Sequence, residues 1–182
     1  MANQLLEAVS KGHDAQLHLH PQWIDAKPIR DDCWQISRHY WRLSQVPNGL
    51  GDRKDFRSLR GLFYLGKQTL EELLRPIKPD YECFAFRAGG YCIQPEKNIL
   101  QAMREEGFRI DSSVTPGRYL EKDYARYDFR MTPRNLSYWK VSNSITESDP
   151  DGDIVEVPIF TDRFTPLFRQ STVTKKTRPL RL

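Results

Sequence analysis

The chain has 182 residues, of which 38% are hydrophobic and 29% are charged, and this composition is typical of a globular domain rather than a disordered segment. Its formal net charge of +4 is too small to indicate a nucleic-acid-binding protein. No apolar run approaches the ~18 residues of a membrane span. We expect one domain over residues 1–172, followed by a basic tail over residues 173–182.

Cysteine usage favours a cytoplasmic protein. The chain has three cysteines, an odd number, and no C-x-x-C motif, so neither a disulfide framework nor a thiolate zinc site is indicated. The first residues contain no apolar segment of signal-peptide length. We therefore expect reduced thiols and a cytoplasmic location.

Helix and strand signals alternate from the N-terminus. A leucine and valine stripe predicts that residues 1–11 are the end of a helix, and Gly12 is suited to stop it. Residues 15–20 alternate apolar and polar side chains, which is the strand pattern, and Pro21 ends that strand because it cannot donate to a ladder.

The next stretch, residues 21–66, contains few periodic signals. A helix over residues 33–45 is one interpretation of it. A capping-box pattern, Thr69-x-x-Glu72, predicts that the next helix begins at Thr69. Pro76 is expected to close that helix.

Further short strands and one helix are predicted in the C-terminal half. The helix, between Pro95 and Gly107, has an apolar stripe at helical spacing. The strands are expected over residues 83–87, 108–111, 137–141 and 154–160. Strands and helices alternating in this way predict βαβ units and a mostly parallel sheet. Ligands of such folds bind where the strands have their carboxyl ends.

His18 and His20 are the sharpest chemical signal. They lie two residues apart at the end of a predicted strand, so their side chains point the same way. Two imidazoles on one side of a strand end are a common half of a metal site, because neutral imidazole binds zinc well. The alternative is that one or both are buried, hydrogen-bonded histidines of the core or its rim.

Other polar residues also follow or interrupt the predicted strands. Arg87, which precedes Gly89 and Gly90, either orients a catalytic carboxylate or forms a structural bridge beside a tight turn. Asp111 follows the next strand and is suited to cap what comes after it. Glu156 lies in an apolar strand, where it faces either a polar cleft or solvent on an edge strand.

Four segments, taken together, resemble the polysaccharide deacetylase superfamily, in its chitooligosaccharide-deacetylase-like form. In the order of that family they are residues 12–21 (GHDAQLHLHP), 86–91 (FRAGGY), 107–114 (GFRIDSSV) and 154–159 (IVEVPI). The resemblance implies a partial, deformed (β/α) barrel with a mostly parallel sheet. It also implies metal-dependent hydrolysis of N- or O-acetyl groups on an acetylated polysaccharide or oligosaccharide.

The resemblance also implies roles for individual residues. His18 and His20 would bind a divalent metal, most often zinc, and Arg87 would orient the catalytic base. Tyr91 would line the substrate cleft.

Two further residues are expected to contact the substrate. They are Trp23, in a loop where an aromatic ring is suited to stacking on a sugar, and Asp111.

The chain departs from the family pattern in ways that bear on activity. The family's second motif has its histidines four residues apart, but Gln22 stands at that position here. The family's opening Asp-Asp strand is absent, and so is a late histidine that would act as the general acid. We therefore expect an incomplete domain with little or no activity alone. The missing strand would leave an unpaired sheet edge open to association.

Three other functions remain open at this stage. A non-catalytic module that binds carbohydrate or a partner protein fits the abundant aromatic residues. An H-x-H metal phosphoesterase would need later histidines, which the chain lacks. Nucleic-acid binding would rest on the basic tail alone, so we expect no nucleic-acid partner.

Overall fold

The computed structural model describes residues 2–37 and 39–160. Three helices lie in this part of the chain: α1 (Ala2–Ser10), α2 (Leu59–Leu74) and α3 (Lys97–Glu105). The main sheet has five strands: β1 (Leu17–Leu19), β4 (Ala85–Ala88), β5 (Ile110–Asp111), β8 (Trp139–Val141) and β9 (Ile154–Glu156). Two separate hairpins are β2 (Lys27–Arg30) with β3 (Cys33–Gln35), and β6 (Tyr119–Glu121) with β7 (Arg126–Asp128). The short 3₁₀ helices are η1 (Pro21–Trp23), η2 (Leu43–Gln45) and η3 (Gly89–Tyr91).

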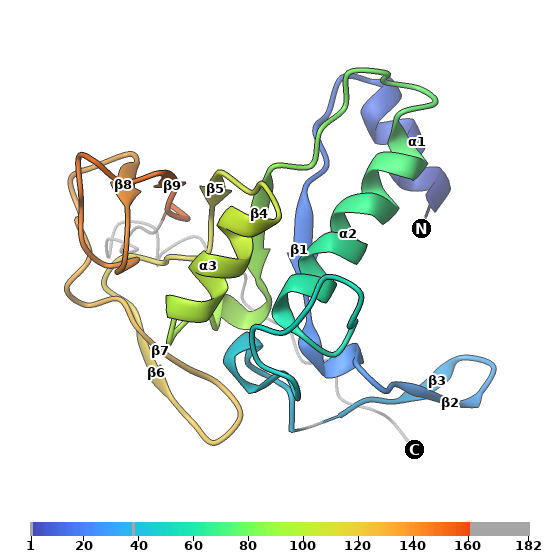
Figure 1. The fold of residues 1–182 in the computed structure, drawn as a ribbon, viewed down its shortest axis with the longest axis horizontal. Coiled ribbons are helices and arrows are strands. Elements are labelled where there is room, and N and C mark those ends of the chain that lie inside the picture. Colours follow the sequence, from blue (N-terminus) through green and yellow to red (C-terminus); the bar gives the residue numbers. More distant parts are fainter. Residues whose placement is uncertain (1, 38, 161–182) are drawn as a thin grey trace, which may run out of the picture.

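The main sheet is mostly parallel. Its strand order is β1-β4-β5-β9-β8, in which the first four strands are parallel and β8 is antiparallel to β9 (Figure 1). Helix α2 connects β1 to β4, and α3 connects β4 to β5, so the chain forms the expected βαβ units. The predicted mixed α/β fold with a mostly parallel sheet is confirmed, whereas closure into a partial barrel remains a proposal.

The helices pack on one face of this sheet. The Phe63 ring of α2 lies 4.7 Å from the Phe86 ring and 5.0 Å from the Phe108 ring, measured between centroids. Leu17 packs closely on Gly66 of the same helix. A Cβ atom added at Gly66 would lie only 2.6 Å from a Leu17 methyl group. Successive strand residues point to opposite faces, so the residues between these core positions point away from the helices.

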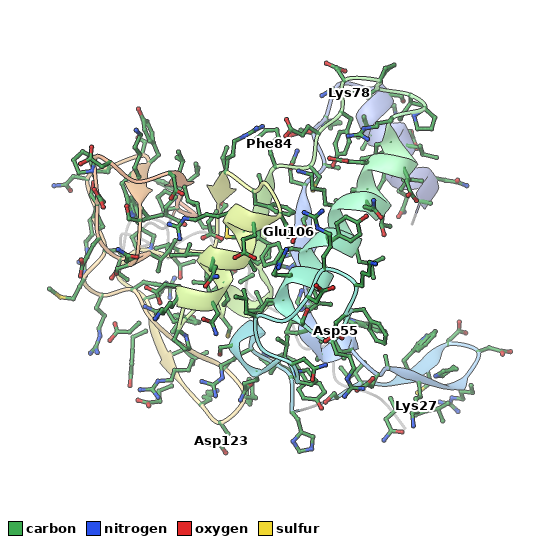
Figure 2. All side chains as sticks on the ribbon, viewed as in Figure 1. Lys27, Asp55, Lys78, Phe84, Glu106 and Asp123 are labelled. Carbon is green, nitrogen blue, oxygen red and sulfur yellow. The ribbon has the colours of Figure 1, made fainter. Side chains whose placement is uncertain are left out.

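A buried carboxylate joins α3 to α2. Glu106, which follows α3, lies between the two helices (Figure 2). It accepts from the guanidinium of Arg53 at 2.8 Å and from that of Arg60 at 3.1 Å. Since the carboxylate is buried and doubly paired, these bonds also hold the loop before α2 against the helical layer.

The predicted start of α2 was wrong. The helix begins at Leu59, and its N-cap is Ser58, whose hydroxyl accepts a hydrogen bond from the Gly61 N–H at 3.2 Å. Thr69 lies inside the helix and donates to the Leu65 carbonyl at 2.8 Å. The capping-box pattern therefore predicted the wrong helix start, because a threonine inside a helix can donate to the carbonyl of the preceding turn.

The predicted helix over residues 33–45 was also wrong. Cys33–Gln35 is instead the strand β3, paired antiparallel with β2 so that Trp34 lies opposite Pro28. Asp31 and Asp32 form the turn between the two strands, a position that aspartate favours. By contrast, three predicted elements are confirmed. They are the helix within residues 1–11, which is α1, and the strands near residues 15–20 and 137–141, which are β1 and β8.

The described residues bear on only part of the predicted domain organisation. The basic tail expected over residues 173–182 lies outside them, as do the last residues of the expected domain. None of the described helices is both long and apolar enough to cross a membrane.

Replacing Phe63 with alanine is expected to lower the free energy of unfolding by about 3–5 kcal/mol, because the ring is fully buried against two other aromatic rings. Chemical denaturation measures this change. The matched control is Leu65→Ala in the same helix, where the side chain is 52% exposed and a change within about 0.5 kcal/mol is expected. Equal losses in the two variants would contradict the described core.

The strand β1 is at the edge of the described sheet, so its outer backbone groups have no strand partner within residues 2–37 and 39–160. Such an edge favours pairing with a second chain. We expect sedimentation velocity to show species larger than the 21.4 kDa monomer, in a proportion that rises with protein concentration. A single monomeric species over a wide concentration range would refute this expectation.

Candidate functional site

The candidate site lies where β1 and β4 have their carboxyl ends. These strands pair in parallel with His18 opposite Arg87. Both residues alternate with core residues, so both point away from the helices. The chain then continues into η1 after β1 and into η3 after β4, which brings His20 and Gly89 to the same edge.

His18 and His20 converge as expected from their spacing. Their Nε2 atoms lie 2.8 Å apart, and their rings meet edge to face with centroids 4.5 Å apart. The Nδ1 atom of His18 lies 3.0 Å from the Arg87 carbonyl oxygen, and the Nδ1 atom of His20 lies 2.9 Å from Nε2 of Gln22. Both rings are therefore held at Nδ1, and both present Nε2 to the same point.

Gly89 provides the space in which the His20 ring lies. A Cβ at this position would lie 2.7 Å from His20 Nδ1 and 2.6 Å from the Leu19 carbonyl oxygen. Both distances are shorter than real Cβ contacts, so any larger residue would displace the ring or the backbone. Close approach of the His20 ring and the Leu19 backbone thus explains the glycine at the start of η3.

The surroundings of His20 favour its neutral form. Partial burial lowers the pKa of His20, the nearby His18 lowers it further, and the hydrogen bond with Gln22 opposes the shift. The neutral imidazole is the form that binds metal ions, so this direction of shift suits a ligand.

The two histidines fit half of a zinc site. With zinc–nitrogen bonds of 2.0–2.1 Å, two tetrahedral ligands have nitrogen atoms about 3.3 Å apart, so the pair would open by about half an ångström around a metal. The described residues contain no cluster of three or more His, Cys, Asp or Glu side chains that could hold a metal. The remaining ligands of such a site would therefore have to come from other groups.

Arg87 does not pair with a carboxylate among the described residues. Its guanidinium donates to the Ser112 carbonyl at 2.9 Å and to the Ser112 hydroxyl at 3.0 Å. These bonds tie the end of β4 to the segment that follows β5. Neither expected partner, a catalytic carboxylate or a structural one, is bonded to Arg87 there.

Asp111 and Glu156 form a buried acidic pair beneath the sheet edge. They lie opposite each other on β5 and β9, and neither is exposed. Asp111 accepts from the Ser113 N–H at 2.9 Å and from the Ser113 hydroxyl at 2.7 Å. A direct contact between Asp111 and a substrate would require this cluster to open. Glu156 occupies neither of its expected positions, in a cleft or on a solvent face.

One proton is expected to be shared within this pair. Burial raises the pKa of Glu156 well above its ordinary value, and the Asp111 carboxylate raises it further. Burial also raises the pKa of Asp111. Glu156 Oε1 accepts from the Val114 N–H at 3.1 Å, but Oε2 has no donor among the described residues. A proton on Oε2 would satisfy that oxygen by donating toward Asp111.

The two expected aromatic contacts are both accessible. Tyr91 is 38% exposed and its ring lies 6.1 Å from that of Tyr127, between centroids. Trp23 is 53% exposed and meets the half-exposed Trp34 edge to face, with centroids 6.2 Å apart. Both rings are therefore accessible to a ligand.

Trp34 also lines a pocket on the β2–β3 hairpin. The pocket has a volume of about 700 Å³, and its other described lining residues are mostly polar, including Asp25, Lys27, Gln35 and Ser37. In Figure 1 the hairpin extends from the edge at which β1 ends. Sequence reasoning missed this pocket because it interpreted residues 33–45 as a helix.

The chain matches no protein-family model, no curated protein and no solved structure. The likeness to polysaccharide deacetylases consequently rests on the four sequence segments.

Glu156→Gln is expected to change how stability depends on pH. Because burial raises the pKa of folded Glu156, its proton is kept in the folded chain at pH values where the unfolded chain has lost it. Stability is then greatest below the unfolded pKa of about 4.3 and falls as pH rises toward the folded pKa, by up to about 1.4 kcal/mol per pH unit. Glutamine is neutral throughout, so the variant should lose most of this slope.

Urea denaturation at a series of pH values measures the effect. The exposed Glu147→Gln is the matched control and should keep the wild-type slope. The account of the buried pair fails if both variants show the same pH dependence as the wild type.

Proposed function

We propose that this chain carries the scaffold and half of the metal site of a carbohydrate deacetylase. The reaction would be hydrolysis of N- or O-acetyl groups on a polysaccharide or surface glycan, and the described residues alone would give little or no turnover. The observation that supports this proposal is the convergence of the His18 and His20 Nε2 atoms at the carboxyl edge of a parallel sheet.

The chain's own residues would bind and orient. His18 and His20 would hold a divalent metal, zinc by donor type, through their converging Nε2 atoms. When bound, the metal would polarise the acetyl carbonyl and acidify water. Tyr91, exposed on η3, would contact the sugar beside this point.

Low activity of the chain alone follows from the groups that the reaction needs. Proton transfer by a positioned acid or base contributes a factor of roughly 100 or more. Asp111 on β5 and Glu156 on β9 are fully buried, and they accept hydrogen bonds from Ser113 and from the Val114 N–H. Neither reaches the surface on which His18 lies, so a base would have to come from elsewhere.

A second function is favoured by one specific observation. The pocket on the β2–β3 hairpin combines the half-exposed Trp34 ring with polar side chains, and an aromatic face with neighbouring hydrogen-bonding groups suits a sugar. A non-catalytic carbohydrate-binding module would need only this pocket. A cytoplasmic location and an acetylated glycan partner are predictions in both cases.

Zinc content distinguishes the two functions. We expect purified wild-type protein to bind about one zinc ion per chain and the His18→Ala/His20→Ala double variant to bind none, because both proposed ligands are removed. His13→Ala removes an exposed histidine outside the pair and should bind zinc as the wild type does. Elemental analysis after dialysis measures all three proteins.

Activity and glycan binding complete this test. Little or no acetate should be released from N-acetylated chito-oligosaccharides by the chain alone. Acetate release that His18→Ala abolishes would show that the chain is a complete enzyme and would refute the proposed dependence on other groups. Glycan binding that is lost in Trp34→Ala, in protein that binds no zinc, would favour the carbohydrate-binding module instead.

A further inference from the structure

Gln22 is the hydrogen-bond partner of His20 at Nδ1, the ring nitrogen that does not face His18. The side chain is buried, with 6% of the residue exposed, and Nε2 lies 2.9 Å from Nδ1 of His20. Its Oε1 atom is also buried and has no hydrogen-bond partner among the described residues. A buried carboxamide with one satisfied end and one unsatisfied end has two orientations, which differ in the group that it offers to His20.

With the Gln22 amide nitrogen toward His20, the contacts allow only one arrangement of protons on the neutral pair. The Arg87 carbonyl can only accept, so His18 carries its proton on Nδ1 and has a lone pair on Nε2. The Gln22 amide nitrogen can only donate, so Nδ1 of His20 accepts, and the His20 proton is on Nε2. His20 Nε2 then donates to His18 Nε2 across 2.8 Å, which completes a chain of three hydrogen bonds.

In this arrangement His20 cannot be a metal ligand through Nε2, because that atom carries a proton. Binding a metal between the two rings requires His20 to carry its proton on Nδ1 instead. Nδ1 then needs an acceptor, and the buried Oε1 of Gln22 becomes that acceptor if the carboxamide turns over. One proton leaves Nε2 and one is gained at Nδ1, so the charge of His20 does not change.

We propose that Gln22 is a positioning residue whose carboxamide orientation sets the tautomer of His20, and thereby switches the histidine pair between a closed hydrogen bond and an open metal site. With the amide nitrogen toward the ring, the two histidines bond to each other. With the amide oxygen toward the ring, both Nε2 lone pairs are free. The consequence for metal binding rests on the proposed function, whereas control of the tautomer does not.

The variants Gln22→Glu and Gln22→Leu separate the two orientations. Glutamate has nearly the same shape but offers only acceptor oxygens, so it fixes the His20 proton on Nδ1. Leucine offers neither a donor nor an acceptor. Gln101→Leu is the matched control, because it removes an exposed carboxamide from α3, far along the chain from the site.

The first measurement is ¹⁵N–¹H correlation NMR of the imidazole rings in metal-free protein at about pH 8, where histidines are mostly neutral. We expect His20 to be protonated on Nε2 in the wild type and in Gln101→Leu, and on Nδ1 in Gln22→Glu. The same His20 tautomer in wild type and Gln22→Glu would overturn the proposal, whatever the metal does.

The second measurement is zinc affinity by competition with a chromophoric chelator. Gln22→Leu should bind zinc 10–100-fold more weakly than the wild type, because a hydrogen-bond partner at Nδ1 orients a histidine that binds metal through Nε2. Gln22→Glu keeps such a partner and should bind zinc at least as tightly as the wild type. Affinity of Gln22→Leu within twofold of the wild type would overturn the link to the metal. If no protein binds zinc, the proposed metal site fails, and the NMR result alone decides whether Gln22 controls the tautomer.

Discussion

The parallel pairing of β1 with β4 is the constraint on which the candidate site depends. The register places His18 opposite Arg87, and the carbonyl oxygen of Arg87 then fixes the His18 ring through Nδ1. The same pairing brings Gly89 against the His20 ring, where no side chain would fit. A slip of one residue would turn His18 toward the helices and Leu17 toward the site, so the core and the site require the same register.

At β1 and β4, the two faces of the sheet carry different kinds of residue, apolar on one and polar on the other. On one face, Leu17 and Phe86 pack against α2 and supply the apolar burial that stabilises the pairing. On the other face, His18 is exposed and has its nitrogen atoms fixed by backbone and side-chain contacts. A rigid apolar layer therefore supports a polar pair that is accessible to a ligand, which is the arrangement that a binding or catalytic site requires.

The acidic pair shows that an acidic residue on or just after a predicted strand need not face a cleft or the solvent. Asp111 and Glu156 lie in register on adjacent strands, but their side chains belong to the buried face. Their carboxyl groups are satisfied by the backbone and hydroxyl of residues just after β5 and, we infer, by a shared proton. The pair stabilises the segment after β5, to which Arg87 is also bonded through Ser112.

Sequence patterns were sufficient for the parts of the fold that depend on local periodicity. The alternation around His18 predicted both the strand and the shared direction of the two histidines, because a strand repeats every two residues. The start of α2 was missed because the Thr69-x-x-Glu72 pattern lies inside the helix, whose actual N-cap is Ser58. The β2–β3 hairpin was missed because residues 33–45 were interpreted as a helix, although Asp31 and Asp32 form a local turn. The role of Gln22 could not be predicted either, since it depends on the burial of one amide oxygen and the tautomer of a neighbouring ring.

The central claim is that the Nε2 atoms of His18 and His20 bind one metal ion together. X-ray absorption spectroscopy at the zinc edge, on zinc-loaded wild-type protein, tests it most directly. The account predicts the multiple-scattering signature of two imidazoles, with nitrogen atoms about 2.0–2.1 Å from zinc, and its loss in the His18→Ala/His20→Ala variant. Bound zinc with no imidazole signature, or the same spectrum in both proteins, would contradict the account.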